Sequence, residues 1–178
     1  MFCSVRYKTF DKVKNMSQIA ETNAVADVLA GLVNETAYLF GRDLDATPDD
    51  LCSCNHDGKA RSVLNIAAEL IGFNHMVAAI LRGETVAFPS QEDRETFAAT
   101  ISSKDLAKAG IEESVGAVNA AIQGIAPDDW MTKITAPWGM EVTKAHLCSW
   151  VALHTMYHDG QVNFLQVLND DTAVHWMS

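Results

Sequence analysis

Two histidines four residues apart, His154 and His158, are the pair in this sequence best suited to chemistry. Four residues make slightly more than one turn of an α-helix, so the two imidazoles are expected on nearly the same face, one turn apart. Two imidazole nitrogens placed in this way can bind one divalent metal ion. We expect both rings to point into a core, where either a metal ion or a carbonyl or carboxylate group satisfies them. That face is apolar, since it also carries Leu147, Val151, Leu165 and Leu168.

A third ligand is expected on a neighbouring helix, and Glu69 is the preferred candidate. It follows Ile66 by three residues and precedes Phe73 by four, which places its carboxylate on the apolar face of a predicted helix. A buried carboxylate without a partner is costly or takes up a proton, so a partner is expected. The alternative is a partly exposed glutamate at the edge of that face, or one paired with Arg61 or Arg82.

His75 is the alternative third ligand. It lies six residues after Glu69 and therefore points off the apolar face, so we interpret it as a residue of a second face or of the surface. One glutamate and two histidines would leave metal positions open to water or substrate, as in catalytic zinc sites. The same donors suit zinc, nickel, iron or manganese, so the sequence does not select the metal.

Three residues beside His158 are interpreted from their place on the same helix. Gln161 follows His158 by three residues. It is expected either to contact a metal-binding side chain or the substrate, or to close a polar layer between helices. Asp159 lies off the apolar face and is expected in solvent. Gly160 costs a helix about 1 kcal/mol relative to alanine, which suggests close approach of another backbone there.

Helical periodicity predicts four long helices that would position these residues. A short helical piece over 91–100 and a short extended stretch over 132–135 are expected between them. An all-α four-helix bundle is the most economical arrangement, and the long connection between the second and third helices permits a crossover. The first two helices are expected from Ser17 to Gly41 and from Ser62 to Gly83. The third is expected to begin at a capping box formed by Ser102 and Asp105 and to end at Gly124, and the fourth is expected over 143–168.

The whole chain of 178 residues fits one domain over 1–178, with an N-terminal extension over 1–15 and a C-terminal tail over 169–178. Its formal charge of −10 argues against a nucleic-acid partner and against an anionic membrane surface. No segment is expected to span a membrane, and the N-terminus lacks the apolar run of a signal peptide. We therefore expect a cytoplasmic protein.

The cysteines predict no disulfide framework, which agrees with a reducing compartment. Cys52, Cys54 and His56 lie within five residues, but the second half of a zinc finger or ribbon is missing. A solvent-exposed loop with incidental thiols is the favoured interpretation. Cys148 is interpreted as a small core residue rather than a nucleophile.

Two segments of the chain resemble the DinB/YfiT-like family, and the resemblance covers roughly 17–168. It implies a four-helix bundle, often dimeric, with a three-histidine site for a divalent metal; some relatives are thiol-dependent transferases or isomerases. Read without a gap from Ser62, the second-helix histidine of the family falls on Glu69, so the resemblance implies a mixed site here. The matching segments are His154-x-x-x-His158-x-Gly160-Gln161, preceded by Pro137-Trp138-Gly139 and Val142-Thr143, and Arg61-Ser62-Val63-Leu64-Asn65-Ile66.

Three functions are consistent with these residues. In the first, a divalent metal held by Glu69, His154 and His158 activates a water or a thiol in an enzyme acting on a small molecule, by thiol transfer or by hydrolysis. The resemblance alone implies thiol transfer. In the second, the site holds a small-molecule ligand without turnover. In the third, the metal site has decayed and the protein serves as a stress-related dimeric scaffold. A homodimer is predicted for two reasons: members of the resembling family are often dimers, and several tryptophans lie outside the apolar faces of the predicted helices.

Overall fold

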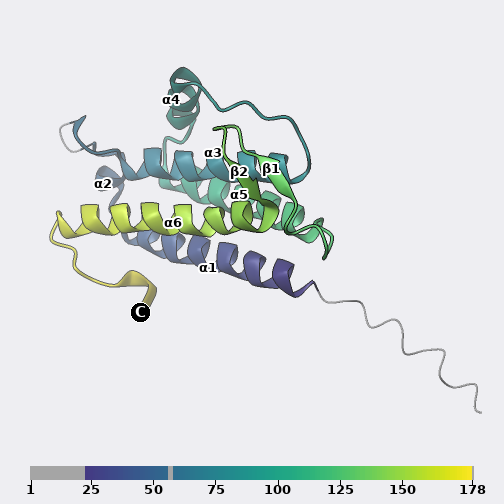
Figure 1. Ribbon diagram of the computed structural model, residues 1–178. Helices are drawn as coiled ribbons and strands as arrows, with labels where there is room; N and C mark the ends of the chain where they lie inside the picture. Colours follow the sequence, from purple (N-terminus) through teal and green to yellow (C-terminus); the bar gives the residue numbers. More distant parts are fainter. Residues whose placement is uncertain (1–22, 56–57, 178) are drawn as a thin grey trace, which may run out of the picture.

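The computed structural model describes residues 23–55 and 58–177, and it is mostly helical (Figure 1). Four long helices lie side by side: α1 (Ala24–Ala46), α3 (Val63–Leu81), α5 (Lys104–Gln123) and α6 (Lys144–Val167). Shorter elements are α2 (Asp49–Ser53), α4 (Gln91–Thr100), the 3-10 helix η2 (His175–Met177), and the strands β1 (Lys133–Thr135) and β2 (Glu141–Thr143). The prediction of an all-α chain is confirmed.

The long helices form a closed ring of neighbours, in which α3 packs against α5 and α6, and α1 packs against the same two helices. Neighbours α3 and α5 run in the same direction, because Asn74 bonds Ser114 while Ile71 lies against Gly110 one turn earlier on both. A Cβ on Gly110 would lie 2.5 Å from Ile71 Cδ1, so glycine permits this close approach. The connection between α3 and α5 therefore returns along the helices, and it carries α4 (Figure 1).

The helix starts follow N-cap chemistry, with two corrections to the predicted bounds. Ser62 caps α3 and Thr143 caps α6, as their side chains accept bonds from backbone N–H groups three residues on. The cap of α5 is Ser103 rather than Ser102. The first helix does not end near Gly41 but continues to Ala46, because a single glycine inside a helix costs only about 1 kcal/mol. Its cap is Asn23, and the predicted cap Ser17 lies outside the described residues.

The core fills the space between the four long helices. It includes Val33 and Phe40 of α1, Leu70 of α3, Ile122 of α5 and Leu147 of α6, all buried. The predicted core face of the last helix is correct for Leu147, Val151 and Leu165, but wrong for Leu168. Leu168 is 58% exposed, because α6 ends at Val167 and Leu168 is its C-cap.

Within the described residues, α3 is the one helix long and apolar enough to cross a membrane by length and composition. Most of it is buried among the other helices, so its apolar character is that of a core helix. Its central position gives it contacts to α5 on one side and α6 on the other.

The extended stretch predicted over 132–135 is part of a two-stranded antiparallel hairpin that leads into α6. Ile134 pairs with Val142, and Gly139 closes the turn with a φ of 86°, a conformation that favours glycine. The Gly139 N–H donates to the Ala136 carbonyl at 2.8 Å. This turn holds Trp138 at the tip of the hairpin, beyond the start of α6.

Candidate functional site

Glu69 of α3 and the two histidines of α6 meet at the contact between these helices. The Nε2 atoms of His154 and His158 lie 2.9 Å apart, and Glu69 Oε1 lies 3.4 Å from each of them. The side chain of His158 is 1% exposed, that of His154 22% and that of Glu69 37%. The three donors predicted from the sequence are therefore brought together, with one histidine deep and one at the edge of solvent.

The separations of the three donor atoms suit one small cation. Zinc–nitrogen distances of about 2.0–2.1 Å in a tetrahedral site place neighbouring donors about 3.3 Å apart. Burial also favours the form of histidine that binds metals, since it lowers the pKa of His154 to about 4. The pKa of His158 is lowered as well, chiefly by burial. Both rings are therefore neutral at pH 7, with a lone pair available.

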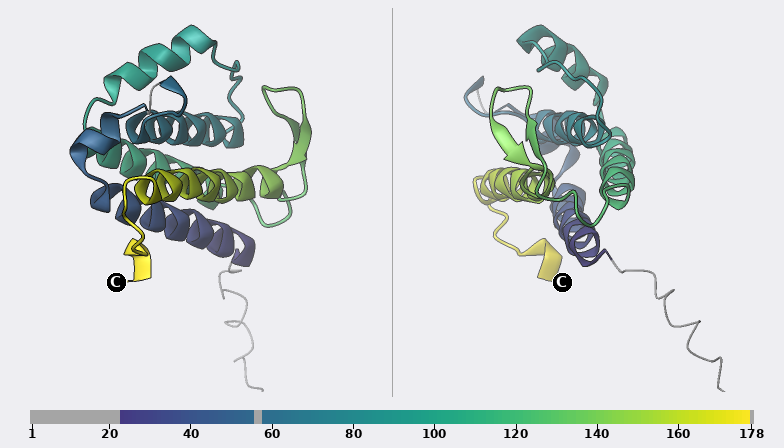
Figure 2. Two further views of the ribbon diagram at one scale, coloured as in Figure 1. Left: turned by 90° about the vertical axis from the view of Figure 1, so that its left-hand side faces the viewer. Right: turned by 45° about the vertical axis from the view of Figure 1, so that its right-hand side comes forward.

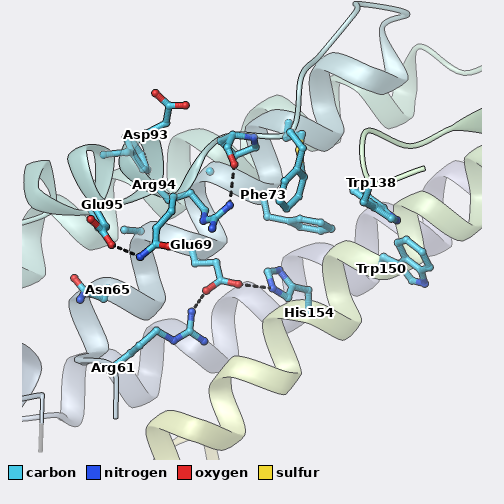
Figure 3. Close-up of a pocket in the computed structure, with 18 of the residues that line it drawn as sticks. Arg61, Asn65, Glu69, Phe73, Asp93, Arg94, Glu95, Trp138, Trp150 and His154 are labelled. Carbon is cyan, nitrogen blue, oxygen red and sulfur yellow. Dashed lines mark hydrogen bonds and ion pairs between the residues drawn. The ribbon is translucent and has the colours of Figure 1, made fainter. Parts of the chain in front are cut away.

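Arg61, just before the start of α3, contacts both the glutamate and one histidine. Its Nη1 makes an ion pair with Glu69 Oε2, the oxygen other than the one nearest the histidines (Figure 3). Its Nη2 lies 3.4 Å from His158 Nδ1. Pairing of Glu69 with Arg61 was one alternative to metal binding, and that ion pair is present; Arg82 instead pairs with Glu84. Because the ion pair engages Oε2, the other oxygen of Glu69, Oε1, faces the two histidines.

Gln161 supports the inner histidine. Its Oε1 lies 2.9 Å from His158 Nδ1 and 3.3 Å from Arg61 Nη2. Because an amide oxygen only accepts, the Nδ1 of His158 carries the proton and its Nε2 keeps the lone pair. A hydrogen bond of this kind fixes the ring orientation of histidine ligands in metal sites.

The outer histidine is oriented by packing instead. The Nδ1 of His154 is buried and has no hydrogen-bond partner among the described residues. Its ring lies against Phe73, with ring centroids 4.4 Å apart. In the absence of a metal, His154 Nε2–H donates to His158 Nε2, so the two rings satisfy each other only in part.

A cavity of about 1060 Å³ opens from Glu69 and His154 toward solvent (Figure 3). Its floor is α3 and α6, and its walls are α4 with the preceding connection and the tip of the hairpin. Figure 2 shows α4 and the hairpin projecting past α3 on the same side of the molecule, and residues of both line the cavity. Aromatic rings dominate the part near the hairpin, among them Trp138 and Trp150.

His75 belongs neither to the donor group nor to the lining of this cavity. Gly160 is exposed, and among the described residues no atom outside its own stretch of α6 backbone lies within 4 Å of the position of a Cβ there, so the expected close approach of another backbone is not seen. His56 of the expected metal-clip alternative lies outside the described residues. Cys52 is buried in α2 rather than in a solvent loop, while Cys54 is exposed.

Cys148 is a buried core residue, as expected, and burial raises the pKa of its thiol to about 12. A thiol with such a pKa carries almost no thiolate at neutral pH, and the thiolate is the nucleophilic form. Cys148 therefore supplies no nucleophile to the site.

The expectation that Asp159 is solvated is wrong. Asp159 is 2% exposed and Asp43 of α1 is 1% exposed, and burial beside Asp43 raises the pKa of Asp159 to about 7. Asn163 donates to Asp43 Oδ2 at 2.7 Å, while Gln166 donates to the Asp43 carbonyl at 2.9 Å. A polar layer between α1 and α6 therefore lies next to the candidate site.

The ion pair of Arg61 with Glu69 was one of the sequence expectations, whereas the contact of Arg61 with His158 was not predicted. The sequence signal for Arg61 is its positive charge near Glu69 rather than helical spacing, because Arg61 precedes the N-cap Ser62 and lies outside α3. No comparable signal marks Trp138 or α4, because both reach the cavity from connections whose path is set by tertiary packing.

Comparison with known proteins gives one family match. Residues 32–162 match the family model of the DinB superfamily. No curated protein matches the chain.

Solved structures share the fold at low sequence identity. A mycothiol-dependent maleylpyruvate isomerase is 18% identical to this chain, with a TM-score of 0.60. The match covers 77% of this chain and 60% of the isomerase chain. A histidine-to-alanine mutant of that isomerase gives the same values. The chain thus spans less than two thirds of the isomerase. The colibactin self-resistance protein ClbS, in complex with dsDNA, is 20% identical with a TM-score of 0.61, over 79% of this chain and 95% of that chain. Since a protein of this fold binds dsDNA, the exclusion of a nucleic-acid partner by charge is not supported.

Proposed function

The chain belongs to the DinB superfamily, and we propose that it is a divalent-metal-binding protein that acts on a small molecule. Glu69, His154 and His158 would hold the ion, and the reaction would be a thiol transfer or a hydrolysis in the adjoining cavity. The thiol chemistry is suggested by the mycothiol-dependent isomerase that shares the fold. The metal identity is left open among zinc, nickel, iron and manganese, because these donors suit all four.

One observation carries the proposal: three potential donors lie within 3.4 Å of one another on two helices, and both imidazoles are neutral. A divalent ion bound to His154 Nε2 would engage the ring through a much stronger interaction than the present contact with His158.

When bound, the metal would supply Lewis acidity and lower the pKa of a water or thiol. The other roles fall to the chain itself. Arg61 orients Glu69 through Oε2, and Gln161 keeps the proton of His158 on Nδ1. The aromatic walls exclude water from the substrate and so strengthen electrostatic interactions in the cavity.

The finer architecture belongs to the same proposal. We infer a single four-helix-bundle domain of DinB type with a crossover between α3 and α5, assembled as a homodimer and located in the cytoplasm. The family match, the parallel packing of α3 and α5 and the apolar outer face of α6 support this assignment.

Zinc titration by calorimetry tests the metal site with two variants of one helix. His154→Ala removes a proposed ligand, whereas His146→Ala changes an exposed histidine of α6 outside the donor group. We expect one zinc per chain in the wild type and in His146→Ala, and binding weakened at least about 100-fold in His154→Ala, beyond the loss caused by removing a supporting residue. Equal zinc binding by both variants would contradict the proposal.

A non-catalytic ligand-binding protein is the second candidate, and the Arg61–Glu69 ion pair favours it. That ion pair, with the contact between the two histidines, satisfies most of the polar groups without a metal. In this case zinc would not bind, and the cavity would still take up an apolar ligand. A decayed site on a stress-related scaffold would bind neither.

A further inference from the structure

Besides Phe97 of α4, four aromatic side chains from four separate segments line the cavity. They are Phe73 of α3, Phe88 of the connection after α3, Trp138 at the hairpin tip and Trp150 of α6. Trp138 is in contact with the other three: its ring centroid lies 6.3 Å from Phe73, 6.4 Å from Phe88 and 5.5 Å from Trp150. We call these four residues the aromatic wall. Figure 3 shows three of them, Phe73, Trp138 and Trp150, on one side of the cavity.

The aromatic wall presents unused ring surface. None of the four rings is fully buried, and Phe88 is 52% exposed. Three of the four also pack against the core, but aromatic residues that gather from distant segments around one cavity with ring surface exposed can hold a ligand as well as stabilise the fold. A cavity of about 1060 Å³ is also much larger than a water or a simple thiol requires. The wall therefore fits a flat, apolar body.

The charges at the inner end of the aromatic wall indicate which charge the rest of the ligand should carry. Glu69 and Arg61 carry opposite charges and cancel, and a histidine that binds a metal ion does so in its neutral form. A divalent ion at these residues would leave a net local charge of +2. His154 touches Phe73 with centroids 4.4 Å apart, so the cationic end and the wall are adjacent.

Two acidic residues of α4 also line the cavity, and both are already hydrogen-bonded within α4 or its N-cap. Asp93 is engaged in the capping box with Ser90, and Glu95 accepts a hydrogen bond from Gln91 at 2.7 Å. Arg94 stands between them in the lining of the cavity. The lining residues Asp93, Arg94 and Glu95 of α4 therefore carry a net charge of −1, so the anionic group of a ligand is expected at the Arg61 end of the cavity rather than beside α4.

We propose that the cavity binds an organic anion with a planar aromatic body, stacked on the aromatic wall, whose carboxylate or thiolate lies beside Arg61 and the metal ion. The charged half of this proposal rests on the proposed metal site; the aromatic half does not. The substrate class is therefore an aromatic acid or aryl thiol rather than an aliphatic one.

Calorimetry with three small probes tests the ligand class on the full chain loaded with zinc. 2-Naphthoate has both features, 2-naphthalenemethanol has the same rings without the charge, and cyclohexanecarboxylate has the charge without the aromatic rings. We expect 2-naphthoate to bind at least about 10-fold more tightly than either of the others. Arg61→Gln should reduce the preference for naphthoate over naphthalenemethanol, with zinc content measured in the same sample.

Tryptophan variants locate the bound probe. Trp138→Leu should weaken naphthoate binding about 10-fold, while Trp176→Leu, in η2 and outside the cavity lining, should leave it unchanged. Circular dichroism of both variants checks that they fold. Equal binding of the three probes by zinc-loaded protein, or unchanged naphthoate binding in Trp138→Leu, would overturn the proposal.

Failure of the metal site gives a different result. Protein that takes up no zinc refutes the proposed metal function and the charged half of the ligand assignment. In such protein, naphthalenemethanol binding that Trp138→Leu weakens would still support the aromatic site. No binding of naphthalenemethanol would overturn that half too.

Discussion

Arg61 pairs with Glu69 through Oε2, while the other oxygen of the same carboxylate, Oε1, lies 3.4 Å from both histidine Nε2 atoms. The carboxylate therefore spans two environments, one cationic and one made of neutral imidazoles. An arginine that engaged both oxygens would compete with a metal ion for the lone pairs of each. This division is what makes Glu69, rather than a third histidine, a workable partner of His154 and His158.

Glu69→Gln should abolish most metal binding, because it keeps the size of the side chain but removes the negative charge. We expect a loss at least as large as the roughly 10- to 100-fold caused by removing a supporting residue of a metal site. His75→Gln, on the same helix but outside the donor group, is the matched control and should bind zinc like the wild type. The opposite pattern, in which only His75→Gln loses the metal, would show that the third ligand is His75.

Zinc should also raise the thermal stability of the wild type. An ion that binds only the folded state at about 100 times its Kd stabilises it by about 2.7 kcal/mol. For a chain of this size that corresponds to a rise in Tm of about 5–10 °C. Differential scanning fluorimetry with and without a chelator measures the shift, and Glu69→Gln should show almost none. An equal zinc-dependent rise in Glu69→Gln would place the ion elsewhere.

The buried pair of Asp43 and Asp159 should make the fold less stable at high pH. Burial beside Asp43 raises the pKa of Asp159 from 3.8 to about 7, so the folded state holds a proton that the unfolded chain releases. The stabilisation from this proton is complete below pH 3.8 and is lost as the pH rises to about 7. Asp159→Asn removes the titration and should raise Tm at pH 8 relative to the wild type.

The measurement for Asp159 is a series of thermal melts from pH 4 to pH 8 in EDTA, which removes any contribution of a metal at the neighbouring His158. The advantage of Asp159→Asn should grow with pH and vanish near pH 4. An advantage independent of pH would mean that the two carboxylates do not share a proton.

The outer face of α6 carries a row of exposed apolar side chains, which supports the proposed dimer. Leu153, Tyr157 and Phe164 are 62–65% exposed and follow one another at helical spacing, with Gly160 between them. A glycine there would let a second copy of α6 approach closely. Phe164→Glu should convert a dimer into a monomer in sedimentation velocity experiments at micromolar concentration, whereas Tyr38→Glu on α1 should not. A wild-type monomer would refute the dimer.

The convergence of Glu69, His154 and His158 was predictable because helix geometry fixes which residues share a face, and apolar neighbours indicate that the face is internal. The same reasoning failed for Asp159. It assumed a single buried face, but α6 packs against both α1 and α3, so residues on two faces are buried. Spacing along one helix does not reveal how many neighbours that helix has.

Other features depend on the path of connections rather than on periodicity. The cavity exists because α4 and the hairpin stand over α3 and α6, and neither position is encoded in a local pattern. Leu168 matched the apolar spacing, yet the helix ends one residue earlier and the side chain meets solvent. Periodicity predicts a face only as far as the helix continues.

The most direct test of the metal site is elemental analysis of the untagged protein, purified without chelator or immobilised-metal chromatography. We expect about one equivalent of a single divalent transition metal per chain, and its loss in His154→Ala. Wild-type protein that contains no metal, and takes up none after soaking in zinc or nickel, would contradict the account.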